Sequence, residues 1–172
     1  MNWRFVPASS FDAHAREWDA LQARTTCTPF LESAFIRPLL QQFGDGTERL
    51  ALLQDASGLR AATLLRPRGR GVWETFQPSQ LPLGPWIGEP EVLPDTLGKL
   101  VRSLPGLALG VGVTQLDPKL VPRPDHSDTC TTLDYIHTSY IDIAGTFDAY
   151  WETRGKNLRQ NTRKQRNKLQ AD

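Results

Sequence analysis

The sequence predicts an α/β fold: a mixed, mostly antiparallel sheet of five or six strands, flanked by helices, with a basic helix at the C-terminal end. Segments with apolar residues at helical spacing alternate with short β-forming segments. Three of the β-forming segments follow one another through short glycine turns, which is typical of an antiparallel meander. The length of 172 residues is enough for one domain with its own hydrophobic core.

Strands are predicted where β-forming residues lie between turn residues. These segments are residues 2–6, 48–55, 59–66, 72–76, 107–116 and 138–143. The segment 107–116 is apolar and is predicted to be a buried strand. The residues predicted to be buried in the core are Trp18, Phe35, Leu39, Leu52, Leu64, Leu109 and Ile141.

Helices are predicted from apolar spacing and from capping residues. Residues 10–24 follow Ser9, which with Asp12 has the character of a capping box. Ser33 precedes residues 34–43, and Gly44 is a natural stop for that helix. The remaining predicted helices are residues 95–103 after the cap Asp95, residues 147–153 after the cap Thr146, and residues 156–170.

The composition makes several classes of protein and site improbable. Cys27 and Cys130 are far apart in sequence, and two cysteines cannot form a disulfide framework or a four-thiolate metal site. The polar stretch 125–130 is interpreted as a surface loop and not as a metal site. The N-terminus does not resemble a signal peptide, and no apolar run reaches the ~20 residues that span a bilayer. We therefore expect a cytoplasmic protein with no membrane partner and no metal.

The charge is distributed unevenly along the chain. Residues 1–152 carry 13 Lys and Arg against 18 Asp and Glu, whereas residues 153–172 carry seven cations against Asp172 alone. Such an asymmetry indicates a segment that meets an anion. Arg159, Arg163 and Arg166 recur on one face of the predicted basic helix, and arginine is suited to bidentate capture of phosphate or carboxylate. The alternative is a solvated helix without a ligand.

Residues 66–71 match the phosphate-loop pattern R-x-x-G-x-G. Such a loop holds phosphate because a helix begins directly after it and presents free N–H groups. Here the β-forming residues 72–76 follow instead, which favours a plain hairpin turn. The pattern resembles the pyrophosphate signature of GNAT acetyltransferases, which bind acyl-CoA, but without the following helix we expect this chain alone to bind no acyl-CoA.

Several segments resemble CelD-like, cellulose-biosynthesis-type members of the GNAT acetyltransferase superfamily, which are related to Fem-type tandem-GNAT transferases. The early match is Thr-Pro-Phe-Leu-Glu-Ser at residues 28–33, leading into the Phe-rich residues 35–44, which end in Phe-Gly. The later match comprises Tyr-Ile-Asp-Ile at residues 140–143, Phe-Asp-Ala-Tyr-Trp at 147–151 and the basic residues 156–164. The resemblance covers nearly the whole chain but only the first half of such a protein.

The resemblance implies an N-terminal GNAT-like domain at residues 1–145. Residues 146–172 would be a helical linker that begins a second, absent GNAT half. The parent protein would be an acyl-CoA-dependent N-acyltransferase, using acetyl-CoA or another acyl-CoA and a small-molecule amine acceptor. This chain would contribute acceptor-side binding, would be inactive alone, and would have the C-terminal half or a partner chain as its partner. Its anion-binding residues would be Lys156, Arg159 and Arg163, and Trp86 in the Pro-rich residues 77–94 would line the cleft.

Two other functions remain open. The basic helix also suits a module that binds nucleic acid or another anionic polymer, although the net acidic residues 1–152 would repel a phosphate backbone. Alternatively, the chain is a non-catalytic interaction domain whose last helix packs on a partner. The residues indicate no general base for catalysis.

Overall fold

The structure is a computed structural model that describes residues 1–141 and 144–171. The chain divides into two compact units, Met1–Tyr135 and Ile136–Asp172. The first unit contains the sheet, and the second contains two helices.

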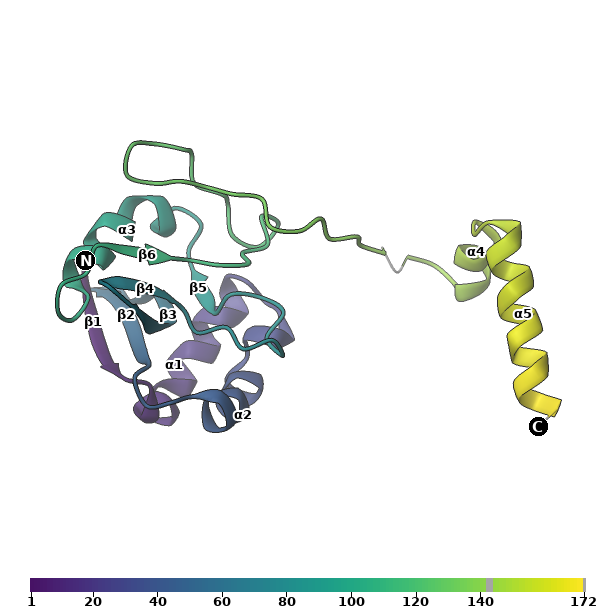
Figure 1. The fold of residues 1–172 in the computed structure, drawn as a ribbon, viewed down its shortest axis with the longest axis horizontal. Coiled ribbons are helices and arrows are strands. Elements are labelled where there is room, and N and C mark those ends of the chain that lie inside the picture. The colour runs from purple at the N-terminus through teal and green to yellow at the C-terminus, as the bar shows by residue number, and fades with distance from the viewer. Residues whose placement is uncertain (142–143, 172) are drawn as a thin grey trace. The chain divides into compact units, whose positions relative to one another are not determined.

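A six-stranded sheet forms the middle layer of the first unit (Figure 1). Its strands lie in the order β1-β2-β3-β4-β6, and β5 also pairs with β3. All pairings are antiparallel except the parallel pair of β4 and β6. The strands are β1 (Asn2–Pro7), β2 (Arg49–Asp55), β3 (Gly58–Gly69), β4 (Val72–Thr75), β5 (Trp86–Gly88) and β6 (Gly110–Gly112). The predicted α/β class with a mixed, mostly antiparallel sheet is confirmed.

Helices cover both faces of this sheet. On one side lie α1 (Phe11–Arg24) and α2 (Ser33–Phe43), with the short 3₁₀ turns η1 (Ala8–Ser10) and η2 (Pro29–Leu31). On the other side lies α3 (Val92–Ser103), which links the parallel strands β4 and β6. Alternate residues of the strands enter opposite cores, so Leu52 packs with Trp18 of α1, whereas Leu53 packs with Leu100 of α3.

Strand β5 was not predicted, because it lies within the Pro-rich residues 77–94. Beside β3, the Cα partner of Leu65 is Thr75 of β4, and the partner of Thr63 is Trp86 of β5. Strand β5 therefore continues the line of β4 after an excursion of the chain through residues 77–85. The excursion places Trp86 fully inside the core that α3 covers.

Three helix starts differ from the predictions. The N-cap of α1 is Ser10 and not Ser9, and its hydroxyl donates to the Pro7 carbonyl at 2.7 Å instead of capping the helix. Helix α3 begins at Val92, so the predicted cap Asp95 lies inside it. Ser33 is the first residue of α2, and its hydroxyl donates to the Asp19 carboxylate at 2.6 Å. The Ser33 hydroxyl therefore bonds to a residue of α1, whereas the sequence alone indicates that it caps α2.

The predicted core is correct for the central residues and wrong at two peripheral ones. Trp18, Leu39, Leu52 and Leu64 are buried, and Phe35 is half-buried. Leu109 is 69% exposed and Ile141 is 63% exposed, so neither is a core residue. Strand β6 is only three residues long and lies at the edge of the sheet, so Leu109 stands outside it.

The segment predicted as a strand at residues 138–143 is not one where the structure describes it. Residues 138–141 belong to no strand or helix, and residues 142 and 143 lie outside the described residues. A strand needs a neighbour for its backbone groups, and local β propensity does not supply one.

The second unit contains α4 (Phe147–Glu152) and α5 (Lys156–Ala171). These bounds agree within one residue with the two helices predicted at 147–153 and 156–170. Among the described residues, no helix is long and apolar enough to cross a membrane.

Candidate anion-binding site

The candidate site lies on α5, and the chain just before it determines where the helix begins. The Thr146 hydroxyl accepts a hydrogen bond from the Ala149 N–H at 3.2 Å and so caps α4. Helix α4 ends at Glu152, and α5 starts at Lys156 after Gly155. The Gly155 carbonyl accepts from the Arg159 N–H at 3.2 Å, which closes the first turn of α5.

Lys156, Arg159 and Arg163 lie on one face of α5. They are spaced by three and then four residues, the spacing that brings side chains together on a helix of 3.6 residues per turn. Lys156 and Arg163 are exposed, and Arg159 is half-buried. The structure therefore brings the three predicted residues together on one helix face.

Arg159 differs from its neighbours because part of its guanidinium group is enclosed. Its Nε atom is buried and has no hydrogen-bond partner. A buried donor without an acceptor is unfavourable, so this atom can gain free energy from an incoming anion. Within residues 144–171, no ion pair joins a cation of α5 to a carboxylate.

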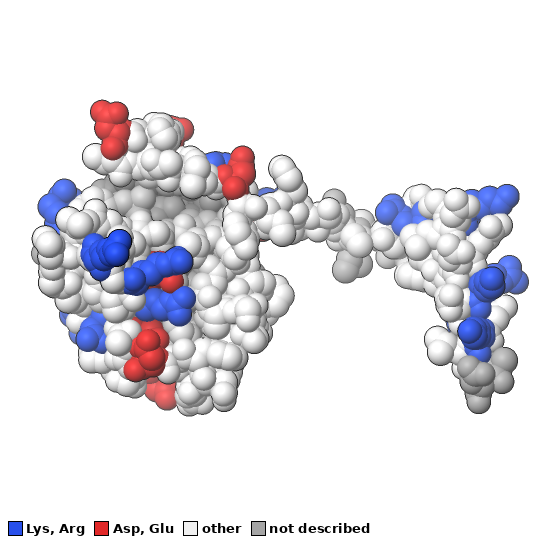
Figure 2. Space-filling view, in the orientation of Figure 1, with Lys and Arg blue, Asp and Glu red and all other residues white. Residues whose placement is uncertain are grey.

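An aromatic cluster on α4 precedes these cations. The rings of Phe147 and Trp151 stack with centroids 5.6 Å apart, and the Arg154 guanidinium lies 4.4 Å from the centre of the Tyr150 ring. Phe147 remains 68% exposed. Figure 2 shows Lys and Arg side chains along the visible face of this unit. The residues just before α5 therefore include one cation that lies over an aromatic ring.

Trp86, the residue predicted to line a cleft, lies in the core of the first unit. Its side chain is fully buried, and its ring centroid is 5.8 Å from that of Trp3. It therefore faces the sheet core and not an open surface.

The glycine-rich residues 66–71 form the end of β3 and the turn into β4. Gly69, Arg70 and Gly71 all have positive φ angles, and β4 follows directly. Arg66 and Arg68 both donate to the carboxylate of Glu74, at 2.9 and 2.6 Å. The turn leads into a strand and two of its three arginines are already paired, so it lacks the helix N-terminus that holds phosphate in such loops.

The polar stretch 125–130 is a small loop in which the Ser127 N–H donates to the Cys130 carbonyl at 2.8 Å. In the part of the chain that the structure describes, no three His, Cys, Asp or Glu side chains are placed to hold a metal ion.

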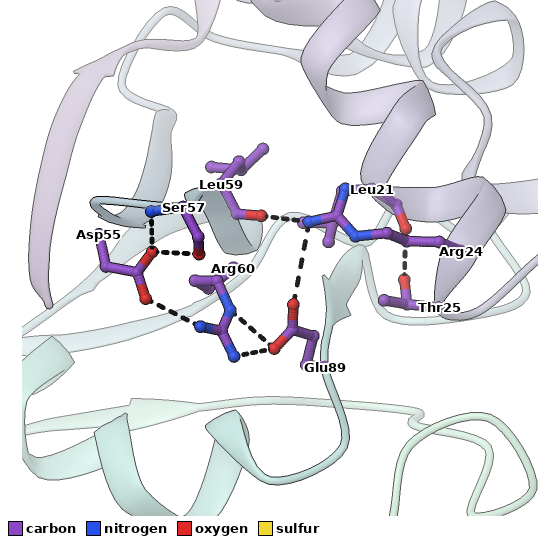
Figure 3. Close-up of polar contacts among 8 residues, drawn as sticks. All are labelled: Leu21, Arg24, Thr25, Asp55, Ser57, Leu59, Arg60 and Glu89. Atoms are coloured by element: carbon purple, nitrogen blue, oxygen red, sulfur yellow. Dashed lines mark hydrogen bonds and ion pairs between the residues drawn. The ribbon is translucent and has the colours of Figure 1, made fainter.

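Sequence reasoning missed a polar network at the other end of the sheet (Figure 3). Arg60 on β3 donates to Asp55 at 2.8 Å and also pairs with Glu89 just after β5. Arg24 at the end of α1 donates to the Leu59 carbonyl at 2.6 Å and lies 3.9 Å from Glu89. The network joins a hairpin, a helix end and β5, so its partners come together only in the folded chain. Its groups satisfy one another, which indicates a structural role.

Comparison with protein-family models, curated proteins and solved structures found no match to this chain.

Proposed function

We propose that this chain is the N-terminal, acceptor-side part of a GNAT-type N-acyltransferase whose donor site belongs to a second half. The observation that supports this most is the face of Lys156, Arg159 and Arg163, which carries positive charge and a buried, unpartnered Arg159 Nε atom. The face lies in the segment whose sequence resembles the CelD-like linker. The mixed sheet with helices on both faces agrees with the fold that the same resemblance implies.

The role of the face in this proposal is to position a substrate. An acceptor with a phosphate or carboxylate group would be held by the two guanidinium groups and the Lys156 ammonium group. Fixing the acceptor in this way would lower the entropic part of the barrier to acyl transfer. The turn at residues 66–71 does not fit the donor, so we assign no chemical step to this chain.

The experiment is a double substitution in the full-length acyltransferase that the proposal implies. Arg159→Gln with Arg163→Gln should strongly reduce transfer from acetyl-CoA to an anionic amine acceptor, measured as release of free thiol. The melting temperature should stay nearly unchanged, because Arg163 is exposed and neither guanidinium joins an ion pair among the described residues.

The matched control is Lys164→Gln with Lys168→Gln. It removes the same charge from α5, but at about 100° per residue these positions lie roughly 80–180° around the helix from the three site residues. An equal loss of transfer activity in both double variants would show that only the net charge of α5 matters. Full activity of the arginine variant would refute the proposed site.

A second candidate function is binding of a nucleic acid. It is favoured because α5 contains six Asn and Gln residues among its cations and no acidic residue. Arg, Lys, Asn and Gln are the side chains that contact phosphates and base edges. Binding of generic DNA that weakens steeply with salt would support this function over acyl transfer.

A further inference from the structure

A cavity in the first unit lies far along the sequence from α5 and is independent of the proposed acyl transfer. It has a volume of about 310 Å³, which is at the lower end of the range for small-ligand pockets. It is bounded by the start of α1, the last turns of α2 and the turn before β2. In Figure 1, α2 lies beside the segment that joins β1 to α1.

The charge of this cavity is dominated by Glu48. The residue is only 3% exposed, and its carboxylate accepts hydrogen bonds from the N–H groups of Asp45 and Gly46, both at 3.0 Å. Among the described residues, no cation forms an ion pair with Glu48. Each carboxylate oxygen can accept a further hydrogen bond, so a ligand with a donor can still bind there.

The other charged groups around the cavity leave the net potential of its lining negative. Asp12 at its edge is paired with Arg37, whose Nε donates to Asp12 Oδ1 at 2.5 Å, so these two charges largely offset each other. Helix α2 ends at Phe43, and the C-terminal end of a helix carries partial negative charge. The balance of the lining is therefore negative, which favours a cation.

Apart from Ser9 and Gln41, the other side chains of the lining are apolar, and the backbone of the turn before β2 lies close to the Glu48 carboxylate. Phe11 and Ala8 are buried, and Leu40 is half-buried. Gly46 has a φ of 87°, which favours glycine. A Cβ on Gly44 would lie 2.5 Å from the Leu40 carbonyl oxygen and 3.3 Å from Glu48 Oε2. These glycines hold the carboxylate at the wall of the cavity.

We infer that this cavity binds an organic ammonium ion, with the ammonium group at Glu48 and a short apolar body against Phe11, Ala8 and Leu40. Charge-assisted hydrogen bonds to a buried carboxylate would supply the selectivity for a cation. The apolar wall would select an alkyl amine over a free inorganic cation. The inference concerns binding alone, so its test does not require acyl transfer.

The test is an NMR titration of the ¹⁵N-labelled chain with n-butylammonium chloride at constant ionic strength. The amide signals of Asp45 and Gly46 should shift saturably, because these N–H groups donate to Glu48. Sodium butyrate and n-butanol are matched probes with the opposite charge and no charge. Equal shifts with n-butanol would overturn the inference.

Three variants complete the test. Glu48→Gln should weaken butylammonium binding about tenfold or more, because it removes the charge from the hydrogen bond. Gln41→Lys, at an exposed lining residue, should also weaken binding, and it keeps the test valid if Glu48→Gln does not fold. Glu17→Gln removes an exposed charge of α1 outside the cavity and should leave binding unchanged. Unchanged binding in Gln41→Lys, or equal weakening in Glu17→Gln, would overturn the inference.

Discussion

At the scale of single residues, burial depends on the neighbours of a strand and not on its hydrophobicity alone. Leu52 and Leu109 both lie in apolar segments predicted to be strands, yet Leu52 is fully buried and Leu109 is 69% exposed. Leu52 is on β2, which has strands on both sides, whereas Leu109 precedes the edge strand β6. The same side chain therefore contributes very differently to stability at the two positions.

The first prediction compares these two leucines. Leu52→Ala should lower the free energy of unfolding by about 2–5 kcal/mol, because it leaves a cavity in a packed core. Leu109→Ala should change it by less than about 0.5 kcal/mol, because the side chain is mostly in solvent. Urea denaturation followed by tryptophan fluorescence measures both values. A large effect of Leu109→Ala would show that the loop around it is packed in solution.

The second prediction concerns Asp55. Hydrogen bonds from the Ser57 hydroxyl and N–H, with further help from Arg60, lower the pKa of Asp55 below its ordinary value of 3.8. A carboxyl whose folded pKa is depressed stabilises the fold above its unfolded pKa. That contribution should be present at pH 7 and should be lost as the pH falls below about 4 through the lowered folded pKa.

The measurement compares the wild-type chain with Asp55→Asn in urea at pH 7 and at pH 3. The variant should be less stable at pH 7, and the difference should shrink at pH 3, where protonation begins to remove the same charge. Asp128→Asn, in an exposed loop at residues 125–130, is the control for the loss of one carboxylate and should leave the free energy of unfolding at pH 7 nearly unchanged. A difference that is the same at both pH values would contradict the prediction.

At the scale of elements, the end of β4 and the Pro-rich excursion after it are held against the residues that follow β6 by close contacts. The hydroxyl groups of Thr75 and Thr114 lie 2.6 Å apart, and the Gly84 N–H donates to the Gln115 carbonyl at 3.1 Å. Gln77 donates to Gln115 and accepts from the Thr114 hydroxyl. Prolines limit the local conformations of the excursion, and these hydrogen bonds determine where it packs.

The third prediction uses the glycine at this contact. A Cβ on Gly84 would lie 1.8 Å from the Thr114 carbonyl oxygen, so Gly84→Ala must displace backbone. We expect a loss of at least about 1–3 kcal/mol, as for other overpacked sites. Gly110→Ala is the matched control, because a Cβ there meets no atom within 4 Å. Thermal denaturation measures the melting temperatures of both variants. Equal melting temperatures would refute the close contact between Gly84 and Thr114.

At the scale of the whole molecule, the described hydrophobic cores lie entirely in the first unit. Their members extend from Trp3 to Val121. In the second unit, Leu158 and Leu169 of α5 are 52% and 78% exposed. An isolated helix of about 15 residues is marginal in water, so α5 depends on other contacts for its stability. The two units should therefore differ in stability.

The fourth prediction is that residues 1–135 fold without residues 136–172. The truncated chain should unfold in one cooperative transition with nearly the same midpoint as the full chain, because its core is complete. A peptide of residues 144–171 should show little helix by circular dichroism. A truncated chain that fails to fold would show that the second unit contributes to the core in solution.

The sequence by itself determined the order and type of most elements. Helical spacing located α1 and α2, glycine turns located β2, β3 and β4, and Thr146 with Gly155 predicted where α4 and α5 begin. These features depend on interactions between residues a few positions apart, which a single sequence shows directly. The face of Lys156, Arg159 and Arg163 was predictable for the same reason, since helix period alone groups them.

Only the tertiary structure decided which features come together across the chain. Strand β5 forms because the part of β3 beyond β4 is available for pairing. Residues 138–141 contain β-forming residues but belong to no strand. The cavity at Glu48 and the network of Arg24, Arg60 and Glu89 likewise join residues that are distant in sequence. Strand pairing and buried charge depend on partners that local propensity does not specify, so they emerge only when the layers pack.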